Sequence, residues 1–352
     1  MTRRPPPAPT TVSVTAASSG TSPGVDRLGL GLAALGRPVY ITAGRDADLG
    51  SHRSIDDLAA RTAEVLDAAY DAGIRYVDCA RSYGLSERFL ASWLRDRPEV
   101  DDVTVASKWG YRYVGGWRAD ADVHEVKDHS AAALDTQLAE TRAELGDRLA
   151  VYQVHSLTPE SPALTDAGVH RRLGALRDAE VRVGFSTSGP RQADVVREAL
   201  AIEVDGVRLF DVVQSTWNLL EPSVGPALQE AADAGVRVVV KEGVANGRLA
   251  PADAAPDDEV DDESAHTADE PARAAQWVAD DLGVPLDRLA LAAVLAQPWA
   301  GTVLSGAVTP DQLRSNVGAA GLVLPAGAVD GLLAGAEPAE RYWQRRAARA
   351  WA

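Results

Sequence analysis

Four side chains in the first half of the sequence could together move a proton. They are the carboxylate, phenol, ammonium and imidazole of Asp78, Tyr83, Lys108 and His155. Asp78 ends the apolar run GIRYVD, where burial of an unpaired carboxylate would be costly. We therefore expect a cation to meet Asp78, and Lys108, at the end of the next apolar run, is the candidate.

An ammonium beside a phenol stabilises the phenolate and lowers the tyrosine pKa from about 10. Tyr83 could then give or take a proton near neutral pH, and His155 could hydrogen-bond the same substrate oxygen. Taken singly, a structural ion pair, a core tyrosine and a satisfied core histidine are the competing interpretations. Together, four such groups near three consecutive strand ends favour a proton-transfer site.

Lysine is scarce, which draws attention to each one. Of 35 Lys and Arg residues, only Lys108, Lys127 and Lys241 are lysine. A lysine can shift its pKa and fits a small space, whereas a guanidinium does neither. Two of the three fall at the ends of strand-like segments, although chance is the alternative for any one of them.

A recurring pattern of helix end, turn and apolar strand organises the chain. It appears in DAGIRYVD (71–78), DAEVRVGF (178–185) and DAGVRVVV (233–240). Eight strand-like runs alternate with helical segments, and they cover 26–35, 73–79, 103–109, 149–155, 181–187, 211–217, 236–242 and 301–307. One helix is expected to begin at Ser54 with a capping box to Asp57 and to end at Gly73.

Eight apolar strands that alternate with helices most simply close into a (β/α)8 TIM barrel. An open, doubly wound sheet is the second choice, but the first strand is not followed by a GxGxxG run. In such a barrel, chemistry gathers at the C-terminal ends of the strands. The proton-transfer residues are expected there.

The chain resembles the aldo-keto reductases from about residue 26 to about residue 320. The resemblance rests on GIRYVDCARSYGLSE, ASKWG, YQVHS, VQSTWNLLEP and SGAVTPDQLRSN. It implies NAD(P)H-dependent reduction of a carbonyl, or the reverse oxidation of an alcohol. It also implies that Tyr83 is the proton donor, that Lys108 lowers its pKa, that Asp78 holds the lysine and that His155 orients the carbonyl.

The resemblance also implies a cofactor site along the later strand ends. The residues expected to bind the cofactor are Ser186, Thr187, Gln214, Trp217, Lys241, Ser305, Gly306, Ala307, Thr309, Gln312 and Asn316. For Asn316, capping of a helix is the alternative. Lys241 stands where the family often has an aromatic residue that stacks on the nicotinamide, so it could instead reach the substrate or a cofactor phosphate.

Cofactor preference has less support in the sequence. Gly306 and Gln312 stand where many family members have a basic pair for the 2′-phosphate of NADPH, and Arg314 is the nearby cation. NADPH is expected as the preferred cofactor from the habit of the family, with NADH possible.

The segment 110–130 should form a substrate wall above the barrel. It is rich in aromatic and ionisable residues and follows Trp109. Trp109, Tyr111 and Trp117 are the candidate substrate contacts for a polar, sugar-like compound, and ordinary loop packing is the alternative. His124, Glu125 and His129 do not form an HExxH motif, so no metal is expected.

Composition bounds the partners and the organisation. The formal net charge of −16 argues against nucleic acid. We expect a Pro/Ser/Thr-rich disordered tail over 1–25, rather than a twin-arginine signal, and a single barrel over 26–352 with a mobile acidic loop at about 250–272. One cysteine favours a cytoplasmic protein, and the lack of a long apolar run argues against a membrane partner. The expected partner is a small carbonyl or alcohol, and the expected assembly is a monomer or small homo-oligomer.

Two other functions remain open. A cofactor-binding regulatory or redox-sensing subunit would bind a dinucleotide with little turnover and would co-purify with one stoichiometric partner. A metal-dependent barrel hydrolase has less support, because no strand end offers a His-x-His pair.

Overall fold

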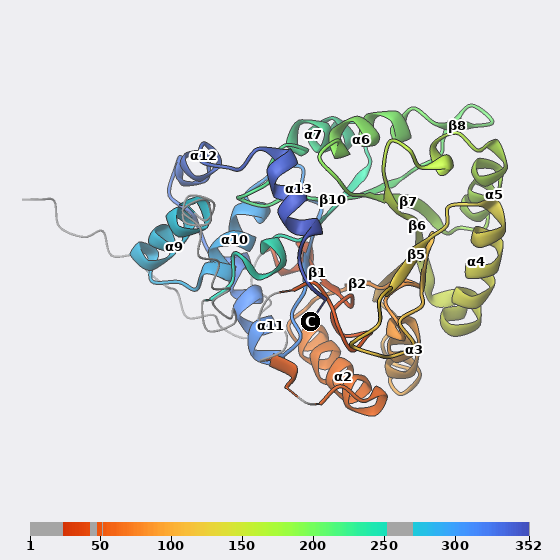
Figure 1. The fold of residues 1–352 in the computed structure, drawn as a ribbon, viewed down its shortest axis with the longest axis horizontal. Coiled ribbons are helices and arrows are strands. Elements are labelled where there is room, and N and C mark those ends of the chain that lie inside the picture. Colours follow the sequence, from red (N-terminus) through yellow and green to blue (C-terminus); the bar gives the residue numbers. More distant parts are fainter. Residues whose placement is uncertain (1–23, 43–47, 51, 252–269, 352) are drawn as a thin grey trace, which may run out of the picture.

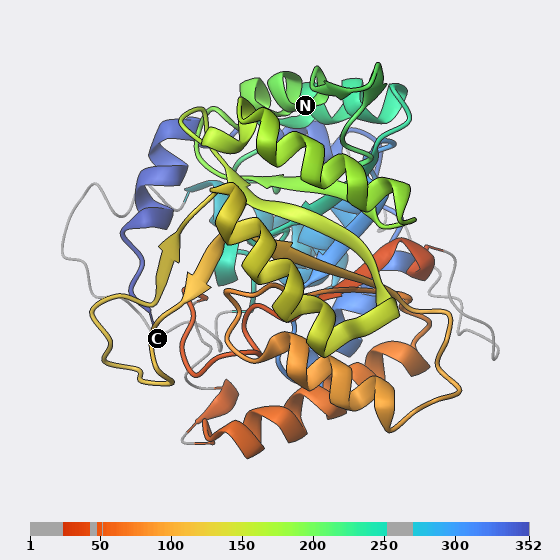
Figure 2. The same ribbon diagram turned by 90° about the vertical axis from the view of Figure 1, so that its right-hand side faces the viewer.

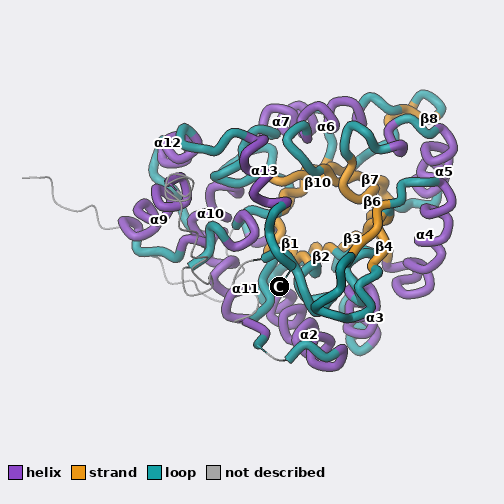
Figure 3. Tube along the Cα trace, in the orientation of Figure 1, coloured by secondary structure: helices purple, strands orange, loops and turns teal. Residues whose placement is uncertain are grey.

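Eight parallel strands form a closed barrel, as the sequence predicted (Figures 1 and 3). The computed structural model describes residues 24–42, 48–50, 52–251 and 270–351. Around the barrel, the strand order is β1-β12-β11-β10-β7-β6-β3-β2. The strands are β1 (Leu28–Gly31), β2 (Tyr76–Asp78), β3 (Thr104–Trp109), β6 (Leu149–Leu157), β7 (Arg182–Thr187), β10 (Val212–Thr216), β11 (Arg237–Lys241) and β12 (Thr302–Ser305).

Helices surround the barrel and cover its apolar outer face (Figure 3). The described helices are α2 (Ile55–Asp71), α3 (Ser86–Arg95), α4 (Ala131–Leu145), α5 (Ala167–Asp178), α6 (Gln192–Leu200), α7 (Gly225–Asp233), α9 (Glu270–Leu282), α10 (Leu286–Leu295), α11 (Pro310–Val317), α12 (Ala328–Leu333) and α13 (Ala339–Ala347), of which α13 lies at one end of the barrel. The predicted capping box at Ser54 and Asp57 is confirmed, and Gly73 follows the helix end at φ +99°. None of the described helices is long and apolar enough to cross a membrane.

Side chains inside the barrel form an apolar layer and, nearer the ends of the strands, a polar layer. One apolar layer consists of Tyr76, Ala106, Val151, Val212, Val239 and Leu304. Because side chains alternate along a strand, the residue two positions further points into the same interior. Two steps on from the first five of these residues stand Asp78, Lys108, Gln153, Gln214 and Lys241. A polar layer therefore lies on an apolar floor.

The segment 110–130 and helix α13 lie at the end of the barrel at which these strands finish. The predicted wall 110–130 contains a hairpin, β4 (Tyr111–Tyr113) paired with β5 (Glu125–Lys127), which the sequence did not predict. A second hairpin, β8 (Glu203–Val204) with β9 (Val207–Arg208), lies elsewhere on the surface. Figure 2 shows the first hairpin and α13 at the same end of the barrel.

Two predictions about organisation fall largely outside the described residues. The disordered tail over 1–25 covers residues of which only 24 and 25 are described, and the acidic loop at about 250–272 covers the undescribed residues 252–269. Both stay predictions.

Candidate active site

The expected ion pair is present at the centre of the polar layer. Lys108 Nζ donates to a carboxylate oxygen of Asp78 and, at 3.1 Å, to the carbonyl oxygen of Cys79. The Lys108 side chain is fully buried and that of Asp78 is 3% exposed. The second oxygen of Asp78 accepts from Gln214 at 2.9 Å and from Gln153 at 3.4 Å. Donors from three other strands therefore hold this carboxylate of β2.

The phenol of Tyr83 lies between two groups that the sequence predicted beside it. Its oxygen is 3.4 Å from Lys108 Nζ and 3.4 Å from His155 Nε2. Tyr83 follows β2 on a tight loop, in which Leu85 N donates to Gly36 O at 2.7 Å. A Cβ on Gly36 would overlap the carbonyl oxygen of Tyr83. The loop after β1 thus packs directly on the loop that carries the phenol.

Burial sets the protonation of both groups. It raises the pKa of Tyr83 well above its usual range, with Asp78 adding to the rise, and Arg37 only partly opposes it. This direction differs from the sequence-based expectation, because the cost of burying a phenolate exceeds the help from nearby cations. Burial, with Lys108 adding to it, lowers the pKa of His155 well below its usual range. The site therefore holds a neutral phenol and a neutral imidazole.

An arginine that the sequence analysis missed contacts Tyr83. The Arg37 guanidinium carbon lies 5.2 Å from the centre of the Tyr83 ring, and the side chain is 1% exposed. Arg37 pairs with Glu125 of β5 at 2.5 Å and donates to Ser82 O at 3.0 Å. Its only signal in the sequence was its place in an apolar segment, which does not distinguish it from the other arginines.

A cavity of about 320 Å³ opens over these groups. Eight of the predicted site residues line it: Asp78, Tyr83, Tyr111, His155, Gln214, Lys241, Ser305 and Gly306. Lys108 lies just behind the wall, in contact with Asp78 and Tyr83. The missed residues Arg37, Glu125, Asn246 and Arg346 also line the cavity.

Other predicted residues lie away from the cavity wall and take part in local structure. Thr187 bonds Ser215 at 2.7 Å, Trp217 packs on Trp299, and Ser186 accepts from the amide of Ser156 at 2.8 Å. Trp109 is buried against His129, Trp117 donates to Arg53 O, and Ala307 is buried. Any contact of these residues with a ligand stays a prediction.

The segment expected to bind the adenosine is similarly engaged. Thr309 caps α11, and Gln312 accepts from Val308 N and donates to Asp48 at 2.7 Å. Asn316 lies in the last turn of α11, where it contacts Ser305 and Asp287. The alternative that Asn316 caps the helix start is therefore wrong, since Thr309 occupies that position.

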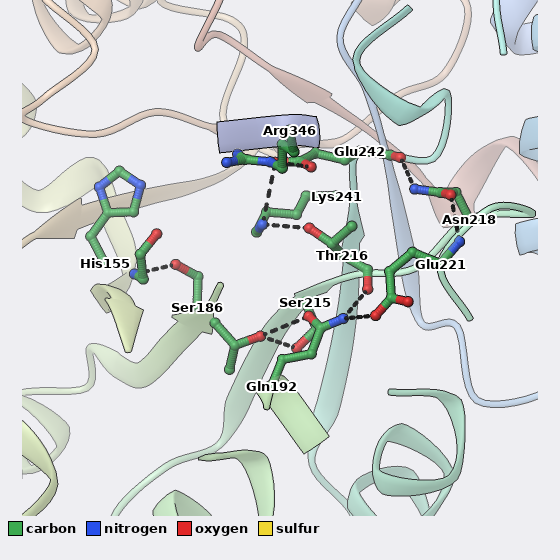
Figure 4. A network of polar contacts seen from close by, with 12 residues as sticks. His155, Ser186, Gln192, Ser215, Thr216, Asn218, Glu221, Lys241, Glu242 and Arg346 are labelled. Carbon is green, nitrogen blue, oxygen red and sulfur yellow. Dashed lines mark hydrogen bonds and ion pairs between the residues drawn. The ribbon is translucent and has the colours of Figure 1, made fainter. Parts of the chain in front are cut away.

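At the end of β11, Lys241 takes part in a network of polar contacts. Its Nζ donates to Thr216 Oγ1 at 2.6 Å and lies 3.5 Å from Glu242 Oε1 (Figure 4). Both carboxylate oxygens of Glu242 in turn accept hydrogen bonds from Arg346 of α13. The chain after β12 therefore returns to the mouth of the barrel, and no periodicity in the sequence predicts that contact.

Comparison with known proteins agrees with this geometry. The model of the aldo/keto reductase family matches residues 28–332, which span the whole barrel. The chain belongs to the aldo/keto reductase family. This membership confirms the resemblance seen in the sequence.

Similar proteins come from several bacteria. D-threo-aldose 1-dehydrogenase from a Pseudomonas species is 28% identical over 337 residues, which cover 88% of this chain and 95% of that protein. Pyridoxal 4-dehydrogenase from Microbacterium luteolum is 27% identical, over 83% of this chain and 89% of the relative. The structure of a glycerol dehydrogenase from Gluconobacter oxydans has a TM-score of 0.65 at 23% identity, over 90% and 95% of the two chains, and supports the fold alone. Family and relatives together support an oxidoreductase acting on carbonyl and alcohol groups.

Proposed function

We propose that this aldo-keto reductase uses a nicotinamide cofactor to reduce a polar aldehyde or ketone to its alcohol, or to oxidise an alcohol or lactol. One observation carries the proposal. The buried phenol oxygen of Tyr83 lies 3.4 Å from both Lys108 Nζ and His155 Nε2 at the base of the cavity. A phenol held between an ammonium and an imidazole can both donate a proton and orient an oxygen.

Each residue has a defined part in this proposal. In reduction, a carbonyl oxygen next to Tyr83 and His155 accepts a hydrogen bond from each, and the Tyr83 proton passes to that oxygen. Lys108 then stabilises the phenolate, and Asp78 keeps the ammonium in place. In oxidation, the same phenolate takes the proton back. A bound nicotinamide cofactor supplies or accepts the hydride.

Polar groups on the cavity wall fit such a cofactor. Gln214 and Ser305 line the wall with amide and hydroxyl groups, and a Cβ at Gly306 would meet no atom within 4 Å, which leaves room for a ligand. Asn246 also lines the cavity, and its buried Oδ1 has no partner among the described atoms. A carboxamide or a ribose hydroxyl would give this oxygen its missing donor.

Two contacts bear on the choice between NADH and NADPH. The carboxylate of Asp48 accepts a hydrogen bond from Gln312, a position at which the family often has a cation for the 2′-phosphate. Arg314, the nearby cation, is exposed and pairs with Asp311 of its own helix. A carboxylate suits a free ribose 2′-hydroxyl and repels a phosphate. This arrangement favours NADH, against the preference for NADPH that we expected from the sequence.

The upper wall favours a substrate with several hydroxyl groups. Glu125 lines the cavity with a side chain that is 19% exposed, and Tyr111 lies beside His155 with ring centres 5.2 Å apart. Carboxylate and phenol oxygens suit hydroxyl donors, while the aromatic face suits a sugar ring. The relative named D-threo-aldose 1-dehydrogenase fits the same class.

Cofactor binding and turnover test the proposal. We would titrate the protein with NADH and NADPH by fluorescence and then assay aldoses with NAD(P)⁺ and hydroxyaldehydes with NAD(P)H. We expect saturable binding and turnover of at least one polyhydroxylated compound. Absence of binding by either dinucleotide would overturn the proposal. Binding without turnover, together with one stoichiometric protein partner, would favour a regulatory subunit.

A further inference from the structure

Two cations share a single carboxylate at the side of the cavity. Arg346 donates to both oxygens of Glu242, with Nε at 2.9 Å from Oε2 and 3.1 Å from Oε1. Lys241 Nζ reaches the same carboxylate at 3.5 Å. The hydrogen bond of Lys241 to Thr216 Oγ1, at 2.6 Å, brings no negative charge to the cluster. The cluster of Lys241, Glu242 and Arg346 therefore carries one excess positive charge (Figure 4).

This excess charge lies where water screens it poorly. The side chain of Glu242 is 8% exposed and that of Lys241 is 15% exposed. A buried charge without a full counter-ion is costly. In agreement, burial lowers the pKa of Lys241 to about 8, and Glu242 opposes this only in part.

The rest of the cavity does not balance the charge. The other described carboxylates on its wall are Asp78 and Glu125, and each already has a cation of its own. Asp78 is paired with Lys108, and Glu125 with Arg37. Within the part of the chain that the structure describes, no carboxylate on the cavity wall is left to balance this charge, so an anion that enters the cavity can supply the counter-ion.

Lys241 also has a donor to offer such a molecule. An ammonium has three N–H donors. In the described structure, two of them are directed at Thr216 and Glu242. Lys241 and Arg346 both line the cavity.

We propose that Lys241 and Arg346, bridged by Glu242, form an anion site that receives a phosphate or carboxylate group of a bound ligand. The inference rests on the proposed function, because both sources of such a group are reaction partners. One source is the diphosphate of the dinucleotide. The other is an acidic substrate whose carbonyl lies at Tyr83.

Charge variants of opposite sign test the site directly. Binding of inorganic pyrophosphate to the whole chain would be measured by calorimetry at pH 7. Lys241→Met should weaken binding roughly ten- to a hundredfold, the loss expected for one charge-assisted hydrogen bond. Glu242→Gln should strengthen binding, because it removes the carboxylate that competes with the anion for Lys241 and Arg346. Weaker pyrophosphate binding in both variants would indicate structural damage and would overturn the proposal. Unchanged binding in Lys241→Met would overturn it as well.

A second set of measurements identifies the source of the anion. If the site holds the cofactor, Lys241→Met raises the Kd of NADH and NADPH, and Glu242→Gln lowers it. If it holds the substrate, the cofactor Kd stays constant and KM rises for acidic substrates but not for neutral ones. Arg197→Met, which removes an exposed cation that pairs with Glu230 on the outer helices, is the control for net charge and should change none of these values. Wild-type protein that binds pyrophosphate but no dinucleotide would overturn the proposed function and leave the anion site standing.

Discussion

The guanidinium of Arg37 lies 5.2 Å from the centre of the Tyr83 ring, and Lys108 Nζ lies 4.8 Å from the same centre. Two cations from different elements therefore contact the phenol that we propose as the proton donor. The other charged or titratable groups around it are Asp78 on β2, Glu125 on β5, His155 on β6 and Tyr40 after β1. Among the cations, only Lys108 was found from the sequence.

Replacement of Arg37 by methionine should make Tyr83 harder to ionise. A cation at this distance favours the phenolate, so its removal should raise the tyrosine pKa by about one unit. Alcohol oxidation needs the phenolate, and its rate at a fixed pH below that pKa should fall roughly tenfold. The pH profile of kcat/KM for oxidation measures this. Arg37→Lys should recover part of the loss, whereas a profile that keeps its position in Arg37→Met would contradict the prediction.

Replacement of Lys108 by methionine should cost both stability and activity. It leaves the carboxylate of Asp78 buried with only amide donors, and breaking a buried pair in this way costs about 3–5 kcal/mol. The double variant with Asp78→Leu should regain most of that stability but no activity. Urea unfolding and kcat together check this. A double variant that remained as unstable as the single one would show that the lost charge pair is not the cause.

Alanine at Gly84 should disturb the loop that positions Tyr83. Gly84 has φ +59°, and a Cβ there would overlap the carbonyl oxygen of Gly36. Gly189 is the matched control, because it has φ +95° but a Cβ added to it would meet no atom within 4 Å. Gly189→Ala should cost about 1 kcal/mol from backbone conformation alone. Gly84→Ala should cost more and should lower kcat, which thermal unfolding and turnover would measure. Equal effects of the two substitutions would refute the steric explanation.

Acid should weaken the fold partly through Glu242. Arg346 and Lys241 hold the pKa of this carboxyl at about 2, below its ordinary value of 4.5, despite burial. The resulting stabilisation, about 3 kcal/mol, is fully present above pH 4.5 and is lost as the pH falls towards 2. Urea unfolding of the wild type between about pH 6 and pH 3 should therefore show a steeper loss than that of Glu242→Gln. Parallel curves for the two proteins would count against the low pKa.

The sequence predicted the barrel well because each strand carries its own local signal. Apolar runs and turn residues predicted all eight strands, and Asp78, Lys108 and His155 were found because polar groups interrupt those runs at their ends. The sequence did not reveal side chains that reach the site only because a distant segment folds back onto the barrel. At the cavity, Arg37 and Arg346 pair with Glu125 and Glu242, which lie 88 and 104 residues away in the sequence.

The same limit explains the predicted residues that do not line the cavity. On β7, Thr187 lies one position after Ser186 and contacts Ser215 and Gln192. Trp217 and Trp109 are large and apolar enough to be core residues, and both are buried against other aromatic rings. Spacing along a strand tells which residues share a face, but it does not tell how far a cavity extends along that face.

The turnover of Tyr83→Phe, with cofactor affinity measured on the same protein, tests the central claim most directly. The substitution removes one oxygen from a buried ring that stays packed on His155 and Arg37. We predict that kcat falls by roughly 10²- to 10⁴-fold, as expected for loss of a general acid, while the Kd for the dinucleotide changes less than about twofold. A variant that kept wild-type kcat would contradict the assignment of Tyr83 as the proton donor.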